Sequence, residues 1–286
     1  MEQETVKRLP PWLKRGIIDC ESSKAVRDIL RANGLNTVCD EARCPNKAEC
    51  FAKKTATFMI LGKNCTRNCR FCAVGHNKPD EVMQDEPQKI AQAVKDLNLR
   101  YAVITSVTRD DLPDGGAGHF KNVICAIKDL DSSVRVEVLT PDFKGDKSCI
   151  ETVVNTSLDV FNHNLETTSR LHKTIRPMAN YERSLEVLRV AKEINPKIKT
   201  KTGLMVGLGE TVEELEEIFE NLVEIKCDIV TIGQYIRPTK KNAEVIKYYE
   251  PQEFEELEKL AKSKGIKYTF FAPLARSSYR AQEVFV

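Results

Sequence analysis

Three cysteines in one short stretch are the residues of this sequence best suited to do chemistry. Cys65, Cys69 and Cys72 stand in a C-x3-C-x2-C spacing directly after the apolar run 57–62, which ends in a glycine. This context predicts three thiolates on a loop at the C-terminal end of a strand. Three soft ligands in one loop suit iron–sulfur chemistry, and a four-iron cluster held by three cysteines leaves one iron open to a substrate or cofactor.

The same loop also allows a zinc site, which we keep as the alternative. A structural zinc ion normally takes four protein ligands, and His76 is the one nearby cysteine or histidine that could complete the set. The spacing favours a cluster, with a zinc knuckle as the second hypothesis.

A second set of three cysteines precedes the first. Cys39, Cys44 and Cys50 stand in a C-x4-C-x5-C spacing, again with no fourth cysteine close by. They could bind zinc with a distant histidine, share the metal of the other set, or hold a second cluster with one unusual ligand. The scattered cysteines are instead expected to be small buried side chains: Cys20, Cys125, Cys149 and Cys227.

Composition bounds the remaining possibilities. The chain has 286 residues, of which 41% are hydrophobic, so it can build a substantial core in one large domain or two small ones. A net charge of +2 predicts no nucleic-acid partner. No apolar run approaches a membrane span, and no signal-peptide pattern opens the sequence. Ten cysteines without a secretory signal therefore predict a cytoplasmic protein that uses thiols for metal or redox chemistry.

From residue 57 onward, short apolar segments alternate with amphipathic ones, which predicts an α/β fold. Helices are expected between the strands, two of them opening with capping boxes at Asp85 and Thr211. Six β–α units imply a parallel sheet with right-handed crossovers, too few for a closed eight-unit barrel. The predicted strands are 57–62, 101–107, 134–139, 158–162, 200–207 and 229–235.

The expected architecture is therefore an open, partial (β/α)6 TIM-like barrel over residues 55–240. Residues 1–54 should form an N-terminal extension of arm, helix and cysteine loop. Residues 241–286 should add a C-terminal helix, a strand and the segment Arg276-Ser-Ser-Tyr279. In such a barrel the chemistry lies at the C-terminal ends of the strands.

The first cysteine loop resembles the signature of the radical S-adenosylmethionine superfamily, in which an aromatic residue, here Phe71, precedes the last cysteine. In that superfamily the open iron of a [4Fe–4S] cluster binds the amino and carboxylate groups of S-adenosylmethionine. Reduction then releases a 5′-deoxyadenosyl radical, which abstracts hydrogen from an unactivated carbon. The resemblance thus implies such a cluster on Cys65, Cys69 and Cys72, with S-adenosylmethionine as cosubstrate.

Polar residues at the predicted strand ends are the candidates to contact S-adenosylmethionine. Ser106 lies near the end of the second strand. Asn164 and Glu166 follow the fourth, where they could bond a ribose or an ammonium group. Together with Phe71 they form the predicted cosubstrate site. His163 is expected instead to be a structural histidine with satisfied hydrogen bonds.

Taken as a whole, the chain resembles the lipoyl synthase family over nearly its entire length. In that family the earlier cysteine set holds an auxiliary [4Fe–4S] cluster. The first serine of Arg-Ser-Ser-Tyr, here Ser277, is its fourth ligand. Besides both cysteine sets, the resemblance is carried by Pro11-Trp-Leu13, Thr105-Ser-Val-Thr-Arg-Asp-Asp111, Asp114-Gly-Gly-Ala117, Gly203-Leu-Met-Val-Gly-Leu-Gly-Glu210, Gly233-Gln-Tyr235 and Arg276-Ser-Ser-Tyr279.

This resemblance implies a sulfurtransferase that inserts sulfur at C6 and C8 of an octanoyl group. The octanoyl group is amide-linked to a lysine of a lipoyl carrier domain or of the glycine-cleavage carrier protein. The auxiliary cluster would be consumed as the sulfur source and rebuilt by a repair carrier. Electrons would come from a donor such as ferredoxin or flavodoxin. No acid–base residue is assigned, because unactivated methylene groups have no acidic proton.

Three rival functions are weighed against this one. A methylthiotransferase also uses two clusters, but it would be expected to carry an additional nucleic-acid-binding domain. Biotin synthase inserts sulfur but lacks the earlier cysteine set. A zinc protein that binds nucleic acid would predict a basic, aromatic-rich surface, which the balanced charge disfavours.

Overall fold

The computed structural model describes residues 8–14, 21–53 and 55–283. In this part of the chain eight strands form one sheet in chain order, and its edge strands, β1 and β8, are not paired with each other. β1 is antiparallel to β2, and all later pairs are parallel. The strands are β1 (Asn36–Thr37), β2 (Thr57–Ile60), β3 (Tyr101–Ser106), β4 (Arg135–Leu139), β5 (Val160–Asn162), β6 (Lys199–Val206), β7 (Ile229–Gln234) and β8 (Tyr268–Phe271).

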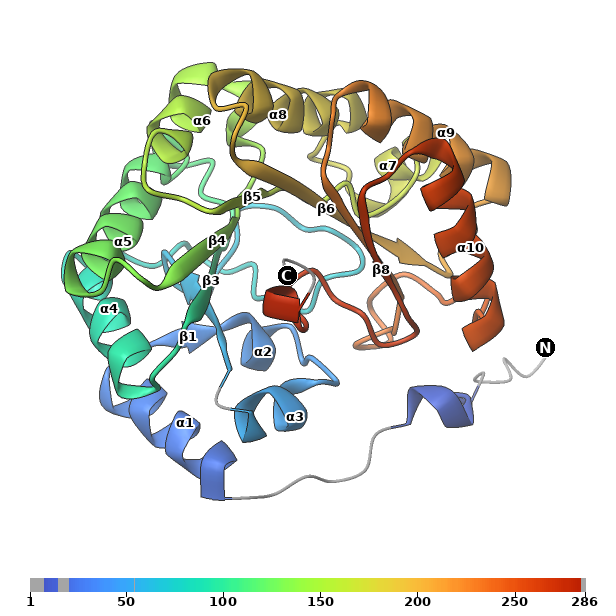
Figure 1. Cartoon of the computed structure of the whole chain (residues 1–286). Coiled ribbons are helices and arrows are strands. Elements are labelled where there is room, and N and C mark those ends of the chain that lie inside the picture. Colours follow the sequence, from blue (N-terminus) through green and yellow to red (C-terminus); the bar gives the residue numbers. More distant parts are fainter. Residues whose placement is uncertain (1–7, 15–20, 54, 284–286) are drawn as a thin grey trace.

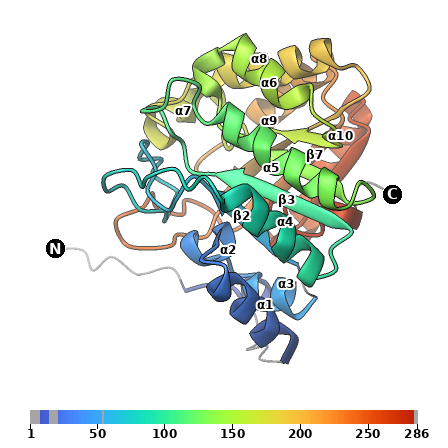
Figure 2. The same cartoon turned by 90° about the vertical axis from the view of Figure 1, so that its left-hand side faces the viewer.

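The sheet curves into an open ring, and the helices that connect its strands lie outside it (Figure 1). Three further helices, α1 to α3, gather at the β1 edge in both views (Figures 1 and 2). The helices are α1 (Glu21–Ala32), α2 (Val38–Glu41), α3 (Lys47–Ala52), α4 (Glu86–Asp96), α5 (Ala117–Leu130), α6 (Lys147–Val154), α7 (Ser169–Ile175), α8 (Tyr181–Ile194), α9 (Val212–Glu224) and α10 (Pro251–Lys264). Short 3-10 turns stand at Pro11–Leu13, Phe143–Gly145 and Ala281–Glu283. No helix among the described residues is long and apolar enough to cross a membrane.

The periodicity of the sequence explains these elements. Strand β2 is buried at all four positions, as expected for a parallel strand covered on both faces. In α9 the apolar residues recur every three or four positions, so one stripe of the helix faces the sheet. That stripe consists of Leu215, Ile218, Phe219 and Leu222, all buried.

The prediction of an open partial barrel is confirmed, with one addition at each edge. Strand β8, expected within the C-terminal extension, joins the sheet beside β7 as a further parallel strand. At the opposite edge β1 pairs with β2 in the antiparallel direction. Both extensions of the predicted core therefore contribute a strand to the same sheet.

One predicted capping box is present and the other is not. Thr211 Oγ1 accepts the N–H of Glu214, and the Glu214 carboxylate accepts the N–H of Thr211. The box predicted at Asp85 is wrong, because that side chain makes no capping hydrogen bond. Glu86, the next residue, is buried instead, where it contacts His119 at 2.6 Å and accepts the N–H of Leu61 at 3.0 Å.

The scattered cysteines follow their predicted burial with one exception. Cys149 and Cys227 are buried free thiols, as predicted. Cys125 is exposed, so the prediction is wrong there. It follows the buried Ile124 on α5, and its side chain is on the solvent side of that helix. Cys20 lies outside the described residues.

Candidate functional site

One cavity of about 590 Å³ occupies the interior of the ring and the C-terminal ends of its strands. Its wall is largely apolar, and the chain segment ending in the turn Ala281–Glu283 lies across the centre of the ring (Figure 1). All eleven residues singled out as candidate site residues line this cavity. They are Cys39, Cys44, Cys50, Cys65, Phe71, Cys69, Cys72, Ser106, Asn164, Glu166 and Ser277.

The loop that carries the C-x3-C-x2-C set follows β2, and backbone hydrogen bonds hold it in place. Cys65 N–H donates to Gly75 O at 2.8 Å, and Cys72 N–H donates to Cys69 O at 3.0 Å. The Sγ atom of Cys65 in turn accepts the backbone N–H of Arg67 at 3.4 Å and that of Thr108 at 3.3 Å. Hydrogen bonds to cysteine sulfur are one of the means by which proteins set the potential of an iron–sulfur cluster.

The thiols within each set lie near enough to influence one another. Burial raises the pKa of Cys72 to about 12, and the neighbouring Cys69 and Cys65 add to this shift. Burial likewise raises the pKa of Cys39 to about 12 and that of Cys50 to about 11, with Cys44 contributing to both. Such thiols release their protons when a cation is present to stabilise the thiolate. The donor sets therefore fit metal clusters.

The zinc knuckle of the alternative hypothesis is not formed. His76 is exposed and is not part of the cavity wall. Within the described residues, no three His, Cys, Asp or Glu side chains converge as ligands of a single metal ion do. A multi-iron cluster separates its cysteine ligands more widely than one ion does.

Asn164 and Glu166 form a polar pair at the end of β5. Asn164 Nδ2 donates to Glu166 Oε1 at 3.0 Å. Glu166 has a left-handed backbone (φ 69°), a conformation that costs a residue with a side chain roughly 1 kcal/mol or more. Two backbone hydrogen bonds to β6, with Gly203 and Met205, hold it there at 2.9 Å each. Burial raises the pKa of the Glu166 carboxyl, whereas Arg176 and Asn164 oppose that rise.

Three buried polar atoms of residues on the cavity wall have no partner among the described residues. They are Ser106 Oγ, His163 Nε2 and Arg176 Nε. An unpartnered buried polar group costs about 1–3 kcal/mol, and in a cavity it marks a place where a ligand can bind. All three atoms therefore favour a polar ligand at this end of the barrel.

The prediction that His163 is a satisfied structural histidine is wrong. Its Nδ1 lies 2.9 Å from Thr140 O, and since a carbonyl only accepts, Nδ1 carries the proton. Burial lowers the pKa of His163 to about 4, so the ring is neutral and Nε2 presents a lone pair. The residue ends up on the wall because it directly follows β5 at the mouth of the barrel.

Sequence reasoning missed two arginines of the cavity wall. Arg176 follows α7 and donates to the backbone oxygens of Asn164 and Leu165 at 2.9 and 3.1 Å. Arg276 also lines the cavity, where burial lowers its pKa and the nearby Cys44 and Glu166 oppose that shift. Neither arginine stands at a strand end. The one local signal for Arg176 was the proline that follows it, which predicts the end of a helix at this position.

The C-terminal segment is docked against the earlier cysteine set. Asn46 Nδ2 donates to Leu274 O at 2.7 Å, and Tyr279 Oη donates to Glu49 Oε1 at 2.9 Å. Between these contacts Ser277 Oγ donates to Asn164 Oδ1 at 2.8 Å. A Cβ at Gly203 would collide with Ser277 Oγ, so only glycine allows this approach. The serine is thus held on the cavity wall beside Asn164 and Gly203.

Comparison with known proteins identifies the family of the chain. Residues 59–222 match the family model described as the Radical SAM superfamily. A lipoyl synthase from Caldicellulosiruptor saccharolyticus is 56% identical over 274 residues, covering 96% of both chains. One from Rubrobacter xylanophilus is 51% identical over 274 residues, covering 96% of this chain and 85% of its own.

Solved structures share the fold at low identity. The structure of HydG, a maturase of the [FeFe]-hydrogenase, has a TM-score of 0.60 at 12% identity, covering 87% of this chain and 63% of HydG. Streptococcus suis SuiB bound to S-adenosylmethionine has a TM-score of 0.57 at 16% identity, covering 76% of this chain and 51% of SuiB. These two support the partial barrel alone, whereas the full-length relatives carry the family: the chain belongs to the lipoyl synthase family of the radical S-adenosylmethionine superfamily.

Proposed function

We propose that this protein is a lipoyl synthase that inserts two sulfur atoms, at C6 and C8, into an octanoyl group amide-linked to a lysine of a lipoyl carrier domain. One observation carries the proposal: two separate three-cysteine sets and Ser277 line the same cavity. A radical generated at one set would then meet the substrate within reach of sulfur held at the other.

In this proposal Cys65, Cys69 and Cys72 hold the cluster that binds S-adenosylmethionine. Cys39, Cys44 and Cys50, together with Ser277 as fourth ligand, hold the auxiliary cluster. When bound, the two groups supply the electron that cleaves S-adenosylmethionine to a 5′-deoxyadenosyl radical and the sulfur that is transferred.

The protein's own residues bind S-adenosylmethionine and the octanoyl chain and shield the radical from water. Phe71, Ser106 and the pair Asn164–Glu166 bind S-adenosylmethionine, and His163, with its unpartnered Nε2, lines the same cavity. The apolar wall receives the octanoyl chain and excludes water, which would otherwise divert a reactive radical. No side chain needs to move a proton to open the methylene C–H bonds.

The finer points of the proposal concern partners and location. Octanoylated carrier proteins are the substrates, including the glycine-cleavage carrier protein, with a ferredoxin or flavodoxin as electron donor and a carrier that rebuilds the auxiliary cluster. The described cysteines are all free, which suits a reducing compartment such as the cytoplasm. Residues 1–54, 55–240 and 241–286 form the auxiliary-cluster extension, the radical core and the segment with the serine ligand.

Mass spectrometry of an octanoyl-lysine carrier peptide tests the proposal. The peptide is incubated without oxygen with iron–sulfur-reconstituted protein, S-adenosylmethionine and a strong reductant. A product that gains two sulfurs is expected, and 5′-deoxyadenosine should form alongside it. Cys65→Ala should abolish both products, while Cys149→Ala, which removes a buried thiol remote from the cavity, should abolish neither.

Each contrary outcome has a distinct meaning. An unchanged peptide with 5′-deoxyadenosine still formed would keep the radical chemistry and overturn the substrate. No 5′-deoxyadenosine from protein verified to contain both clusters would overturn the function itself. Deoxyadenosine formation by Cys65→Ala would contradict the assignment of the two cysteine sets.

A further inference from the structure

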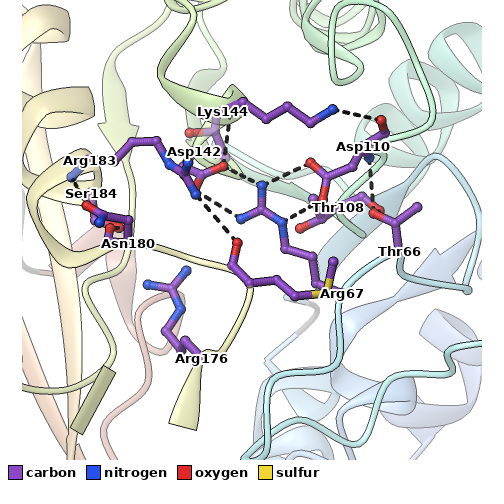
Figure 3. Close-up of polar contacts among 12 residues, drawn as sticks. Thr66, Arg67, Thr108, Asp110, Asp142, Lys144, Arg176, Asn180, Arg183 and Ser184 are labelled. Atoms are coloured by element: carbon purple, nitrogen blue, oxygen red, sulfur yellow. Dashed lines mark hydrogen bonds and ion pairs between the residues drawn. The ribbon is translucent and has the colours of Figure 1, made fainter. Parts of the chain in front are cut away.

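Arg67 belongs to the C-x3-C-x2-C loop, between Cys65 and Cys69, but its side chain is not part of the cavity wall. The side chain is 5% exposed and points into the protein between the loops that follow β3 and β4 (Figure 3). A buried cation inside a cluster-binding loop needs a physical reason, because burying an unpaired charge is strongly unfavourable.

The guanidinium is paired with two carboxylates at once. Its Nε and Nη2 donate to Asp110 at 2.7 and 2.9 Å, and its Nη1 and Nη2 donate to Asp142 at 3.0 and 2.7 Å (Figure 3). Both pairs are bidentate, a geometry that the planar guanidinium provides and an ammonium does not. Asp110 follows β3 and Asp142 follows β4, so one side chain ties the cysteine loop to two strand ends.

Both carboxylates are themselves held in place. Asp142 is completely buried, accepts Arg183 Nε at 2.8 Å and accepts the backbone N–H of Lys144 at 3.1 Å. Burial alone would raise the pKa of Asp142, but Arg67 holds it well below its usual range, so it is ionised. The Asp110 N–H donates to Thr66 Oγ1 at 3.0 Å, which returns the network to the cysteine loop.

The network ends at the sulfur of Cys65. That sulfur accepts two backbone N–H groups, one from Arg67 itself and one from Thr108. A third contact joins these donors, since Thr66 N–H donates to Thr108 O at 3.0 Å. The ion pairs with Asp110 and Asp142 therefore fix the two backbone segments that point N–H dipoles at this sulfur.

We propose that Arg67 is a positioning residue that sets the reduction potential of the cluster held by this loop. This inference rests on the proposed ligand role of Cys65. N–H groups directed at a cysteine sulfur and nearby positive charge both stabilise the reduced, more negative cluster. Loss of Arg67 releases the donors and leaves the carboxylates of the buried Asp142 and the half-buried Asp110 without this cation, so the reduced state becomes harder to reach.

Redox titration of the reconstituted protein tests the inference, monitored by the electron paramagnetic resonance signal that changes when S-adenosylmethionine is added. In Arg67→Gln the ratio of reduced to oxidised cluster at a fixed potential should fall at least tenfold, which corresponds to about 59 mV for a one-electron couple. Arg67→Lys keeps the charge but cannot span both carboxylates, so its ratio should fall in the same direction. It also serves as the test if the glutamine variant does not fold.

Two control variants separate positioning from charge and from stability. Arg183→Gln removes a cation from Asp142 without touching the cysteine loop, and should change the ratio less than twofold. Lys192→Met breaks a partly buried ion pair with Asp228 (2.6 Å), which stands just before β7; neither residue lines the cavity. It should lower the unfolding temperature and leave the ratio unchanged.

Three outcomes would overturn the inference. Equal shifts in Arg67→Gln and Arg183→Gln would show that charge alone matters. An unchanged ratio in Arg67→Gln or Arg67→Lys would show that the bidentate ion pairs of the guanidinium do not set the potential. If the unaltered protein gives no signal that responds to S-adenosylmethionine, the ligand assignment fails first, and the inference with it.

Discussion

Ser277 is the residue at which the two halves of the site meet. An oxygen ligand on iron is a poorer match than a thiolate, so a serine is suited to bind a cluster that must later be dismantled. In the structure its hydroxyl donates to Asn164, one of the residues proposed to bind S-adenosylmethionine.

Ser277→Ala is expected to separate the two activities. Sulfur transfer should be lost because the auxiliary cluster lacks its fourth ligand. Formation of 5′-deoxyadenosine should stay within about twofold, since a single neutral hydrogen bond to Asn164 contributes only about 1 kcal/mol. Single-turnover assays that quantify both products make the measurement, with Ser278→Ala as the neighbouring control. Equal loss of both products would argue against the ligand role.

His163 predicts a pH dependence of stability. Its folded pKa of about 4 is below the ordinary value of 6.5, so the stability linked to its neutral form is present above pH 6.5. That stability is lost as the pH falls from 6.5 toward 4, because the unfolded chain binds the proton first.

For one such group, the free energy of unfolding should drop by about 2 kcal/mol between pH 8 and pH 5. Urea denaturation of the iron-free chain at both pH values measures the drop, and His163→Gln should show a drop smaller by that amount. An identical drop in both proteins would mean that His163 is not buried as a neutral ring.

At this scale the sequence predicts residues whose spacing or strand-end position carries chemistry. The cysteines, Ser106, Asn164 and Glu166 all meet at one cavity for that reason. Arg176 was not predictable, because it reaches the wall from the end of a helix through contacts made by tertiary packing. The role of His163 was predicted from its residue type alone. Its ring orientation depends on a hydrogen bond to the carbonyl of Thr140, which follows the neighbouring strand β4.

Among the secondary-structure elements, α9 shows how local sequence fixes an element boundary. Its capping box satisfies N–H groups at both Thr211 and Glu214. Thr211→Ala should lower the free energy of unfolding by about 1 kcal/mol. Asp85→Ala is the matched control, since Asp85 occupies the same position on α4 without a capping hydrogen bond. Urea unfolding of both variants makes the comparison, and equal losses would show that the box on α9 contributes nothing.

The contrast between these two helices shows where local patterns fail. The sequences of residues 85–88 and 211–214 both predict a capping box. At the first of them, however, Glu86 is buried, where its carboxylate contacts His119 and accepts the N–H of Leu61. The left-handed residue Leu61 directly precedes the cysteine loop. Long-range contacts of Glu86 therefore decide the start of α4, and the local capping pattern does not.

Seen as a whole, the barrel contains a buried charged cluster among its strands. Lys201 and Glu137 are almost completely buried and lie 2.9 Å apart, on β6 and β4. The same carboxylate accepts Tyr101 Oη at 2.6 Å and Asn162 Nδ2 at 3.1 Å. Four strands thus share one polar centre inside a mostly apolar ring.

Removing one member of this pair should destabilise the whole fold. Lys201→Met leaves the Glu137 carboxylate uncompensated and should cost about 3–5 kcal/mol of unfolding free energy. The double variant Lys201→Met with Glu137→Gln should recover most of that loss, because no unpaired charge remains. Chemical denaturation of both proteins provides the test. A double variant no more stable than the single one would contradict this account.

The overall architecture was predictable because alternating strands and helices leave few arrangements for a parallel sheet. The pairing of the edges was not. Strand β1 has two residues and no periodicity to detect, and β8 was expected only as part of an extension. Both join the sheet through backbone hydrogen bonds, which any sequence can make.

The contact between Asn46 and Leu274 joins residues 228 positions apart, and it has a consequence for biosynthesis. Chains emerge from the ribosome N-terminus first, so the earlier cysteine set is made long before its partner segment. The cysteine loop around Cys65 meets Asp110 and Asp142 early in synthesis, and its latest backbone partner is Ala243. The place for Ser277 exists only when nearly the whole chain is complete. In the proposed function the auxiliary site is therefore assembled last although its cysteines are translated first, and a cluster bound there would best be delivered to a finished protein.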